Sequence, residues 1–188
     1  MPANPLGVLL RARRAGHHTL AWANPDLQAP ETFTLSSPAF APGAPIPERH
    51  RGRLRGPNIS PALEWTTPPA DTRELVLIVQ DPDVPFARPA THALTLGIDP
   101  TLQSIPENGL TDPSPIRGIK HGKGGLGRRG YSGPLPIRSH GPHSYAFQLF
   151  ALDQPIELPD RFSLADTLHA MTGHVIARTR LDGTYEIR

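Results

Sequence analysis

The chain has 188 residues, with 19 Lys and Arg against 17 Asp and Glu, and it contains no cysteine. This length suits one domain with some additional chain. The near balance of charge argues against a dedicated nucleic-acid-binding protein. The absence of cysteine excludes disulfides, thiol catalysis and thiolate metal sites. The 24 prolines and 17 glycines predict many turns, short strands and few long helices.

Residues 1–30 are expected to form an N-terminal extension, a short helix plus a linker, ahead of one domain over residues 31–188. Leu6, Leu9 and Leu10 fall on one helical face, which predicts an amphipathic helix that ends near Gly16. Because a short isolated helix needs tertiary packing to persist, we favour packing on the body of the same domain. A homodimer contact and adsorption on an anionic surface are the alternatives.

No apolar run approaches the roughly 20 residues that a transmembrane helix needs. Near the N-terminus, the apolar stretch at 6–10 precedes the basic residues at 11–14, whereas a signal peptide has its positive charge before a longer apolar stretch. We therefore expect a cytoplasmic protein with at most peripheral membrane contact.

From residue 31 the sequence is typical of β-structure. Alternation over 32–35 predicts a half-buried strand, and 36–62 are expected to form a long ordered loop. Apolar runs rich in β-branched residues predict buried strands at 74–80, 91–98 and 144–152.

The rest of the chain adds a loop, a helix and a strand. Residues 99–130 are expected to form a long excursion rich in glycine and basic residues. Ser163 and Asp166 form an N-cap pair for a helix over 163–171 that Gly173 ends, and a final strand is predicted over 174–181. Together these elements predict a mostly β fold, a β-sandwich with a few peripheral helices.

Two proline-rich loops each lie beside a histidine at the mouth of an apolar run. The first is Asp81-Pro82-Asp83-Val84-Pro85, followed by His92, and the second is Gly130-Tyr131-Ser132-Gly133-Pro134-Leu135-Pro136, followed by His143 and Tyr145. Two carboxylates, two imidazoles and two phenols could converge on one pocket that suits an anionic group such as phosphate. A lone histidine in such a place is more often a satisfied core residue, so the two loops are informative only as a pair.

Asp81 directly follows a buried strand, where an unpaired carboxylate is costly. We expect it to accept a hydrogen bond from one nitrogen of a site histidine, so that the other nitrogen points into the pocket; capping of the following turn is the alternative. For Asp83, a turn-stabilising role and a ligand role are equally compatible with the sequence. Gly133 and Pro134 are expected to shape the wall, and Tyr131 is either a wall residue or a core residue.

These motifs resemble those of the phosphatidylethanolamine-binding proteins, in particular the bacterial Raf-kinase-inhibitor-like branch. The resemblance covers about residues 33–185 and implies a Greek-key type of β-sandwich. It also implies that His92, His143 and Tyr145 belong to an anion site, and that a cis peptide bond precedes Pro85. For function it implies phospholipid-headgroup binding and, in relatives, inhibition of kinases or proteases.

The sequence departs from the family pattern at two places. Family members often carry an aromatic residue shortly before the first site histidine, where this chain has Arg88-Pro89-Ala90-Thr91. They often carry arginine after the second, where this chain has Ser144. The first departure predicts a wider rim, without a defined specificity for ethanolamine. The second removes a cation and predicts either a weaker affinity for anions or a change of partners.

The sequence therefore predicts a non-enzymatic protein with no cofactor and no bound metal. Its ligand would be a phosphate-bearing small molecule, a lipid headgroup or a phosphorylated protein partner such as a kinase or hydrolase. Ser139 lies near His140, but no Gly-x-Ser-x-Gly elbow surrounds it. The alternative is a metal-assisted hydrolase with ligands from Asp81, Asp83, His92 and His143.

Basic residues gather in the glycine-rich excursion, at Arg117, Lys120, Lys123, Arg128 and Arg129. No Gly-Lys-Ser/Thr sequence closes it, so it is not a P-loop. We expect a solvated, mobile loop that steers anions toward the pocket. Nucleic-acid binding is not expected, because aromatic residues are not interleaved with the basic ones.

Overall fold

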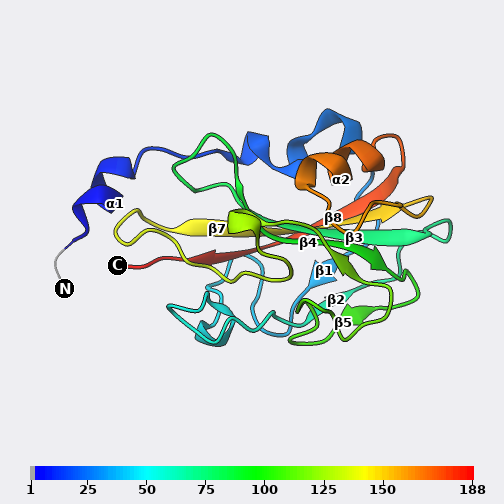
Figure 1. Ribbon diagram of the computed structural model, residues 1–188, viewed down its shortest axis with the longest axis horizontal. Coiled ribbons are helices and arrows are strands. Elements are labelled where there is room, and N and C mark those ends of the chain that lie inside the picture. Colours follow the sequence, from blue (N-terminus) through cyan, green and yellow to red (C-terminus); the bar gives the residue numbers. More distant parts are fainter. Residues whose placement is uncertain (1–2) are drawn as a thin grey trace.

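A five-stranded antiparallel sheet in the order β6-β4-β3-β7-β8 forms the centre of the protein (Figure 1). The computed structural model describes residues 3–188, without the side chain of Leu126. The strands of this sheet are β3 (Glu74–Asp81), β4 (Ala90–Ile98), β6 (Lys120–His121), β7 (His143–Leu152) and β8 (Val175–Tyr185). A three-stranded antiparallel sheet lies against one face and contains β1 (Leu35–Ser36), β2 (Leu63–Trp65) and β5 (Ser104–Ile105). These two sheets confirm the predicted mostly β, sandwich-like fold.

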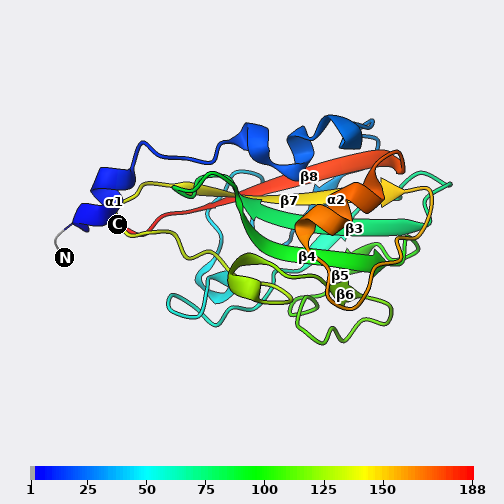
Figure 2. The same ribbon diagram turned by 45° about the horizontal axis from the view of Figure 1, so that its top comes forward.

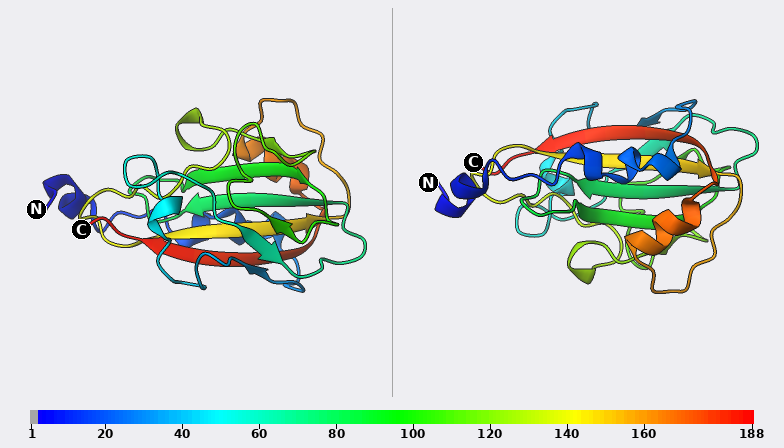
Figure 3. Two further views of the ribbon diagram at one scale, coloured as in Figure 1. Left: turned by 90° about the horizontal axis from the view of Figure 1, so that it is seen from below. Right: turned by 90° about the horizontal axis from the view of Figure 1, so that it is seen from above.

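The opposite face of the large sheet is covered by α2 (Leu164–Met171) and by residues 17–27 (Figures 2 and 3). Residues 17–27 form three short 3₁₀ turns, His17–Thr19, Ala21–Ala23 and Pro25–Leu27. Two further 3₁₀ turns, Glu48–His50 and Gly125–Gly127, lie in the long loops. Ala21 and Leu27 are buried in the same cluster as Met171 of α2. Part of the N-terminal extension is therefore packed into the core.

Alternate side chains of β3 enter two different hydrophobic cores. Leu75, Leu77 and Val79 face the small sheet, whereas Val76 and Ile78 face α2 and the N-terminal turns. Side chains in a strand point alternately to the two faces of a sheet, so a strand covered on both faces needs apolar residues at every position. This double burial explains the continuous apolar run that predicts β3.

The predicted strands at 74–80, 91–98, 144–152 and 174–181 are confirmed, and the last one extends to Tyr185. The helix cap is confirmed as well: the Ser163 side chain accepts the Asp166 N–H, and the Asp166 side chain accepts the Ser163 N–H. Over residues 32–35, Phe33 and Leu35 are buried as the alternation predicts, but strand pairing is confined to Leu35–Ser36.

The N-terminal helix is shorter than predicted. α1 spans Pro5–Leu10 and ends well before Gly16. Beyond the helix the chain turns to other partners: the N–H groups of Ala15 and Gly16 donate to the carbonyls of Val84 and Pro82 at 3.0 and 2.9 Å.

α1 contacts the rest of the protein through its glycine. The Cα of Gly7 lies so close to the Arg138 backbone that an added Cβ would come within 1.9 Å of that carbonyl oxygen. Leu6 and Leu9 are 55% and 78% exposed, although we expected the leucine face to pack on the body. The alternative roles of this face, a homodimer contact or adsorption on an anionic surface, stay predictions.

Two buried glutamines hold the N-terminal turns on the sheet. The side-chain carbonyl of Gln80 accepts the N–H of Ala21 at 2.9 Å, and that of Gln148 accepts the N–H of Trp22 at 2.7 Å. The Gln148 amide also donates to Gln80 at 3.1 Å. Polar side chains in an apolar layer are tolerated because each satisfies a backbone group that would otherwise be unpaired.

Replacing Gln148 with Leu should lower the free energy of unfolding by about 1–3 kcal/mol, because it leaves the Trp22 N–H without its acceptor. Denaturant unfolding of the two proteins measures this difference. Gln103→Leu, at an exposed position, is the matched control and should change stability by less than about 0.5 kcal/mol. Equal losses in both variants would contradict the role assigned to Gln148.

Candidate anion-binding site

Three neighbouring strands bring the predicted site residues to one end of the large sheet. Asp81 is the last residue of β3, His92 lies near the start of β4, and His143 is the first residue of β7. Because β3 lies between β4 and β7, Asp81 is adjacent to both histidine-bearing strands. α1 and the C-terminus lie at this same end of the molecule (Figure 1).

Asp81 orients His143. The Nδ1–H of His143 donates to Asp81 Oδ2 at 2.7 Å, and the side chains are 1% and 3% exposed. The other carboxylate oxygen accepts the N–H of Asp83 at 2.8 Å. A buried carboxylate is costly unless it is paired, and here both oxygens have donors. Asp81 thus combines the two alternatives of the sequence analysis, because it orients a histidine and also caps the following turn.

The second nitrogen of His143 is not free to enter a pocket, so that part of the prediction is wrong. His143 Nε2 lies 2.7 Å from Nδ1 of His140, and the Nε2–H of His140 donates to the Leu10 carbonyl at 2.9 Å. His140 is completely buried. Burial, and next the charge of His143, lowers the pKa of His140. His140 lies in the loop before β7 and belongs to neither of the two site motifs.

His92 differs from His143 in its partners. Its Nδ1–H donates to the carbonyl of Ser132 at 2.5 Å, and its ring packs edge-on against Tyr145 with centroids 5.1 Å apart. Burial lowers the pKa of His92, and the negative charge of Asp81 opposes that effect. Its Nε2 makes no hydrogen bond to the residues that the structure describes, so His92 keeps one nitrogen for a ligand.

Asp83 ties the first loop to its surroundings. One carboxylate oxygen lies 3.2 Å from the Arg14 guanidinium, and the other accepts the N–H of Ser144 at 2.7 Å. The geometry therefore shows a structural role for Asp83. Ser144, which stands where family members often have arginine, serves this loop through its backbone.

Tyr145 is buried in the main core, with its hydroxyl beside the Asp81 carboxylate. Burial and the nearby charge of Asp81 raise the pKa of this phenol well above its ordinary value. The hydroxyl therefore stays protonated and keeps its donor next to Asp81 and His92.

The second loop is fixed by contacts with residues 50–58. Tyr131 is a core residue, because its hydroxyl donates to the carbonyl of His50 at 2.9 Å and burial raises its pKa. The N–H of Gly133 donates to the Asn58 side chain at 2.8 Å, and an added Cβ would come within 2.3 Å of the His50 carbonyl. Pro134 contributes its carbonyl, which accepts the N–H of Gly52. Glycine is therefore required at position 133 because the backbone of His50 leaves no room for a side chain.

One cavity of about 740 Å³ opens between the two loops. Four of the eight predicted residues line it, namely Asp81, His92, Gly133 and His143. The other four, Asp83, Tyr131, Pro134 and Tyr145, do not belong to the lining. Arg53, Leu54 and Phe86 line it as well, and no sequence motif identified them; Arg88, Arg128 and Leu135, which were already noted in the sequence, complete the mouth. Phe86 supplies an aromatic residue just before the stretch at 88–91 that lacks one.

The Val84–Pro85 bond is trans, so the predicted cis bond is wrong; among the described residues the cis bond precedes Pro113. The first loop is instead held by the hydrogen bond from Asp83 to Asp81 and by backbone bonds from the N-terminal segment.

The basic excursion is partly ordered by strand pairing. Lys120 pairs with Leu96 of β4, and Arg129 donates to the His121 carbonyl and lies 3.4 Å from Asp112. Within this group, Arg128 is the basic residue that lines the cavity.

The proposed metal ligands are not arranged as a metal site. Among residues 3–188, no three His, Asp or Glu side chains lie where they could hold a metal ion together. Asp81 and His143 are instead bonded to each other, and Asp83 is bonded to Arg14.

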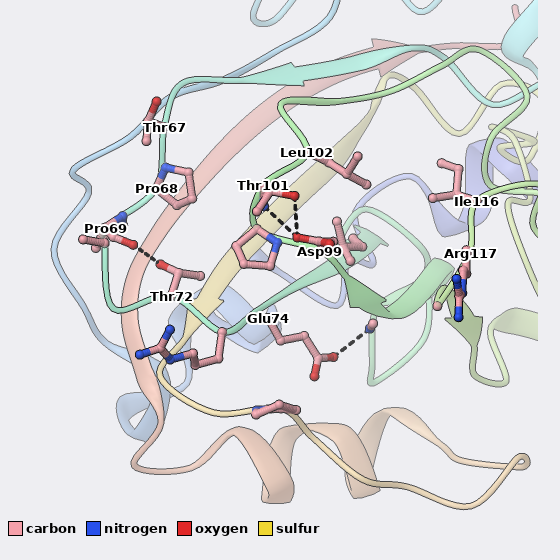
Figure 4. Close-up of a pocket in the computed structure, with 17 residues that line it drawn as sticks. Thr67, Pro68, Pro69, Thr72, Glu74, Asp99, Thr101, Leu102, Ile116 and Arg117 are labelled. Carbon is pink, nitrogen blue, oxygen red and sulfur yellow. Dashed lines mark hydrogen bonds between the residues drawn. The ribbon is translucent and has the colours of Figure 1, made fainter.

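A larger cavity of about 1160 Å³ lies at the opposite end of β3 (Figure 4). The two carboxylates in its lining are used within the protein. Glu74 accepts the N–H groups of Gly97 and Ile156, both at 2.7 Å, and Asp99 accepts two hydrogen bonds from Thr101. Burial raises the pKa of Glu74. Arg73 and Arg117 also line this cavity, and within residues 3–188 neither pairs with a carboxylate.

Comparison with known proteins gives a consistent result. The sequence model of the phosphatidylethanolamine-binding protein family matches residues 36–186. A UPF0098 protein of Methanothermobacter thermautotrophicus is 36% identical over 154 residues, which cover 81% of this chain and 98% of that protein. A Mycobacterium tuberculosis protein named as the lipoprotein LppC is 35% identical over 158 residues, 84% of this chain and 74% of that protein.

Among solved structures, Escherichia coli YbcL, described as a member of the mammalian PEBP family, aligns with a TM-score of 0.78 at 25% identity. The alignment covers 83% of this chain and 99% of YbcL. No helix within residues 3–188 is long and apolar enough to cross a membrane. Fold, motif positions and sequence identity lead to one assignment: the chain belongs to the phosphatidylethanolamine-binding protein family.

Proposed function

We propose that this protein binds a small phosphate-bearing ligand in the cavity between its two proline-rich loops. The observation that carries the proposal is uncompensated positive charge: Arg53, Arg88 and Arg128 line the cavity, and within residues 3–188 none of them pairs with a carboxylate. The carboxylate of Asp81 in the lining is already paired with His143. Membership of the family supports the same class of ligand.

The apolar part of the mouth supports a ligand with an organic substituent. Leu54, Phe86 and Leu135 are 81%, 67% and 45% exposed, which is unusual for side chains of this size. They surround the same opening as the three arginines. A phospholipid headgroup or a phosphomonoester would place its phosphate by the arginines and its organic part against these side chains.

The contacts around the nearest candidate nucleophile support a binding role without catalysis. The hydroxyl of Ser139 accepts the N–H of Asn4 at 3.1 Å. The ring of the adjacent His140 has both nitrogens bonded, to His143 and to Leu10. Serine catalysis needs a base within hydrogen-bonding distance of the hydroxyl, and this pair does not provide one. Modulation of a kinase or hydrolase and a cytoplasmic location stay predictions.

Arg88→Gln should weaken binding of phosphoethanolamine roughly tenfold, about 1.4 kcal/mol, because it removes one charged donor from the phosphate. Titration followed by NMR measures the affinity, and the loss should shrink as added salt screens the charge. Arg73→Gln, in the larger cavity at the far end of the sheet, is the control and should leave the affinity unchanged. An equal loss in both variants, or none in Arg88→Gln, would contradict the proposed site.

Anion affinity should also rise as the pH falls, through His92. Neutral His92 carries its proton on Nδ1, bonded to Ser132, so Nε2 can donate to an anion only after protonation. Because burial lowers the pKa of His92, the ring is neutral near pH 7, and anion binding takes up a proton. Sulfate, which does not itself titrate in this range, should bind more tightly by up to about tenfold per pH unit as the pH falls through and below 6.5.

The control for this experiment is His92→Asn. The asparagine amide can still donate to the Ser132 carbonyl but has no proton to gain. Sulfate affinity in this variant should change less with pH than in the wild type. Identical pH profiles for the two proteins would remove His92 from the site.

A further inference from the structure

The hydrogen bonds around His140 and His143 fix the number of protons that the two rings share. At one end, the Nδ1–H of His143 donates to the Asp81 carboxylate, and at the other the Nε2–H of His140 donates to the Leu10 carbonyl. Both acceptors are oxygen atoms that cannot supply a proton themselves when Asp81 is ionised. Each ring therefore uses one proton in a hydrogen bond outside the pair, His143 to Asp81 and His140 to Leu10.

The contact between the rings needs one proton more. His143 Nε2 and His140 Nδ1 are 2.7 Å apart, and two lone pairs at this distance would repel each other. The three hydrogen bonds thus require three protons on two imidazoles, which gives the pair one positive charge. This charge balances the negative charge of Asp81 in a buried environment.

The N-terminal segment holds His140 in this position from several sides. Besides the bond to Leu10, the Arg14 guanidinium donates to the carbonyls of His140 and Pro142 at 3.3 and 3.0 Å. The N–H of Asn4 donates to the side chain of Ser139 at 3.1 Å. The loop that contains His140 is therefore attached to residues before, within and after α1.

We propose that His140 is a positioning residue that occupies His143 Nε2 and prevents His143 from donating to an anion in the cavity. The inference rests on the proposed function, because it concerns the same cavity. His143 lines that cavity, yet both of its nitrogens are bonded within the protein. An anion gains the donor of His143 only when His140 turns away, and the N-terminal segment opposes this movement.

Several charged or titratable groups face the histidine pair. Asp81 at the end of β3 accepts the hydrogen bond of His143, whereas the charge of Arg14 in the N-terminal segment lowers the pKa of His140. His92 on β4 also senses the charge of His143. The first loop contributes Asp83, which is already paired with Arg14.

The direct test is His140→Ala. Removing the imidazole leaves His143 Nε2 unoccupied, so a protonated His143 can donate to phosphate. Affinity for inorganic phosphate at pH 6 should rise on the order of tenfold, the effect of one added charge-assisted hydrogen bond. His140→Asn is the conservative variant, since its amide, like Nδ1 of histidine, is one bond from Cγ. It should keep His143 occupied and leave the phosphate affinity near that of the wild type.

Gly7→Ala tests the part played by the N-terminal segment without touching the site. The added Cβ would meet the Arg138 carbonyl at 1.9 Å, so α1 must shift away from the loop that contains His140. Alanine favours a helix more than glycine does, so helix propensity alone cannot explain a loss of contact. Phosphate affinity should rise in the same direction as in His140→Ala. Leu9→Ala, at an exposed position of the same helix, should change nothing.

The NMR titration of the His143 ring without ligand separates this inference from the proposed function. In the wild type the signals of His140 and His143 should follow the pH together, and in His140→Ala the His143 ring should titrate alone. If no protein binds phosphate but the rings titrate together, the proposed function fails. If the wild type binds phosphate and His140→Ala binds it no more tightly, the inference about His140 is overturned. An unchanged affinity in Gly7→Ala alone would overturn the role of the N-terminal segment.

Discussion

The buried carboxylate of Asp81 is the constraint on which this end of the molecule depends. It lies at the end of the central strand β3, where an unpaired charge would cost several kcal/mol. One of its oxygens is satisfied locally by the N–H of Asp83, but the other needs a donor from β7, which is His143. His143 in turn needs a partner for its second nitrogen, and His140 needs one for its own. The requirement for hydrogen bonds thus extends outward from the sheet until it ends at a backbone carbonyl of the N-terminal segment.

The sequence predicts what depends on local pattern. The apolar run of β3 and the cap formed by Ser163 and Asp166 can each be recognised from residues that are close in the sequence. Both are present in the structure. The short strands β2, β5 and β6 have two or three residues each, so their existence depends on pairing with distant partners. The path of the chain at Ala15 and Gly16, where the helix was expected to continue, depends likewise on distant carbonyls at Val84 and Pro82. Periodicity within one segment contains no information about such partners.

The same distinction between local pattern and distant partners applies to the candidate site. Its loops could be located from proline, glycine and histidine, but the role of each side chain depends on which residues lie across from it. Tyr131 and Pro134 hold the second loop against residues 50–52, and Asp83 holds the first loop against Arg14, so these side chains do not line the cavity. The arginines and apolar residues of the mouth come from three separate loops and share no motif. Only their positions in space identify them as one surface.

The two histidines of the site show why residue identity alone does not determine what a pocket offers. His92 donates its Nδ1–H to a neutral carbonyl, which leaves a neutral ring with an unoccupied Nε2. His143 donates the corresponding proton to the Asp81 carboxylate. The Nε2 of His143 is the one that His140 occupies. A motif that specifies two histidines therefore describes two different chemical groups, and the residues behind each ring decide which of them a ligand can reach.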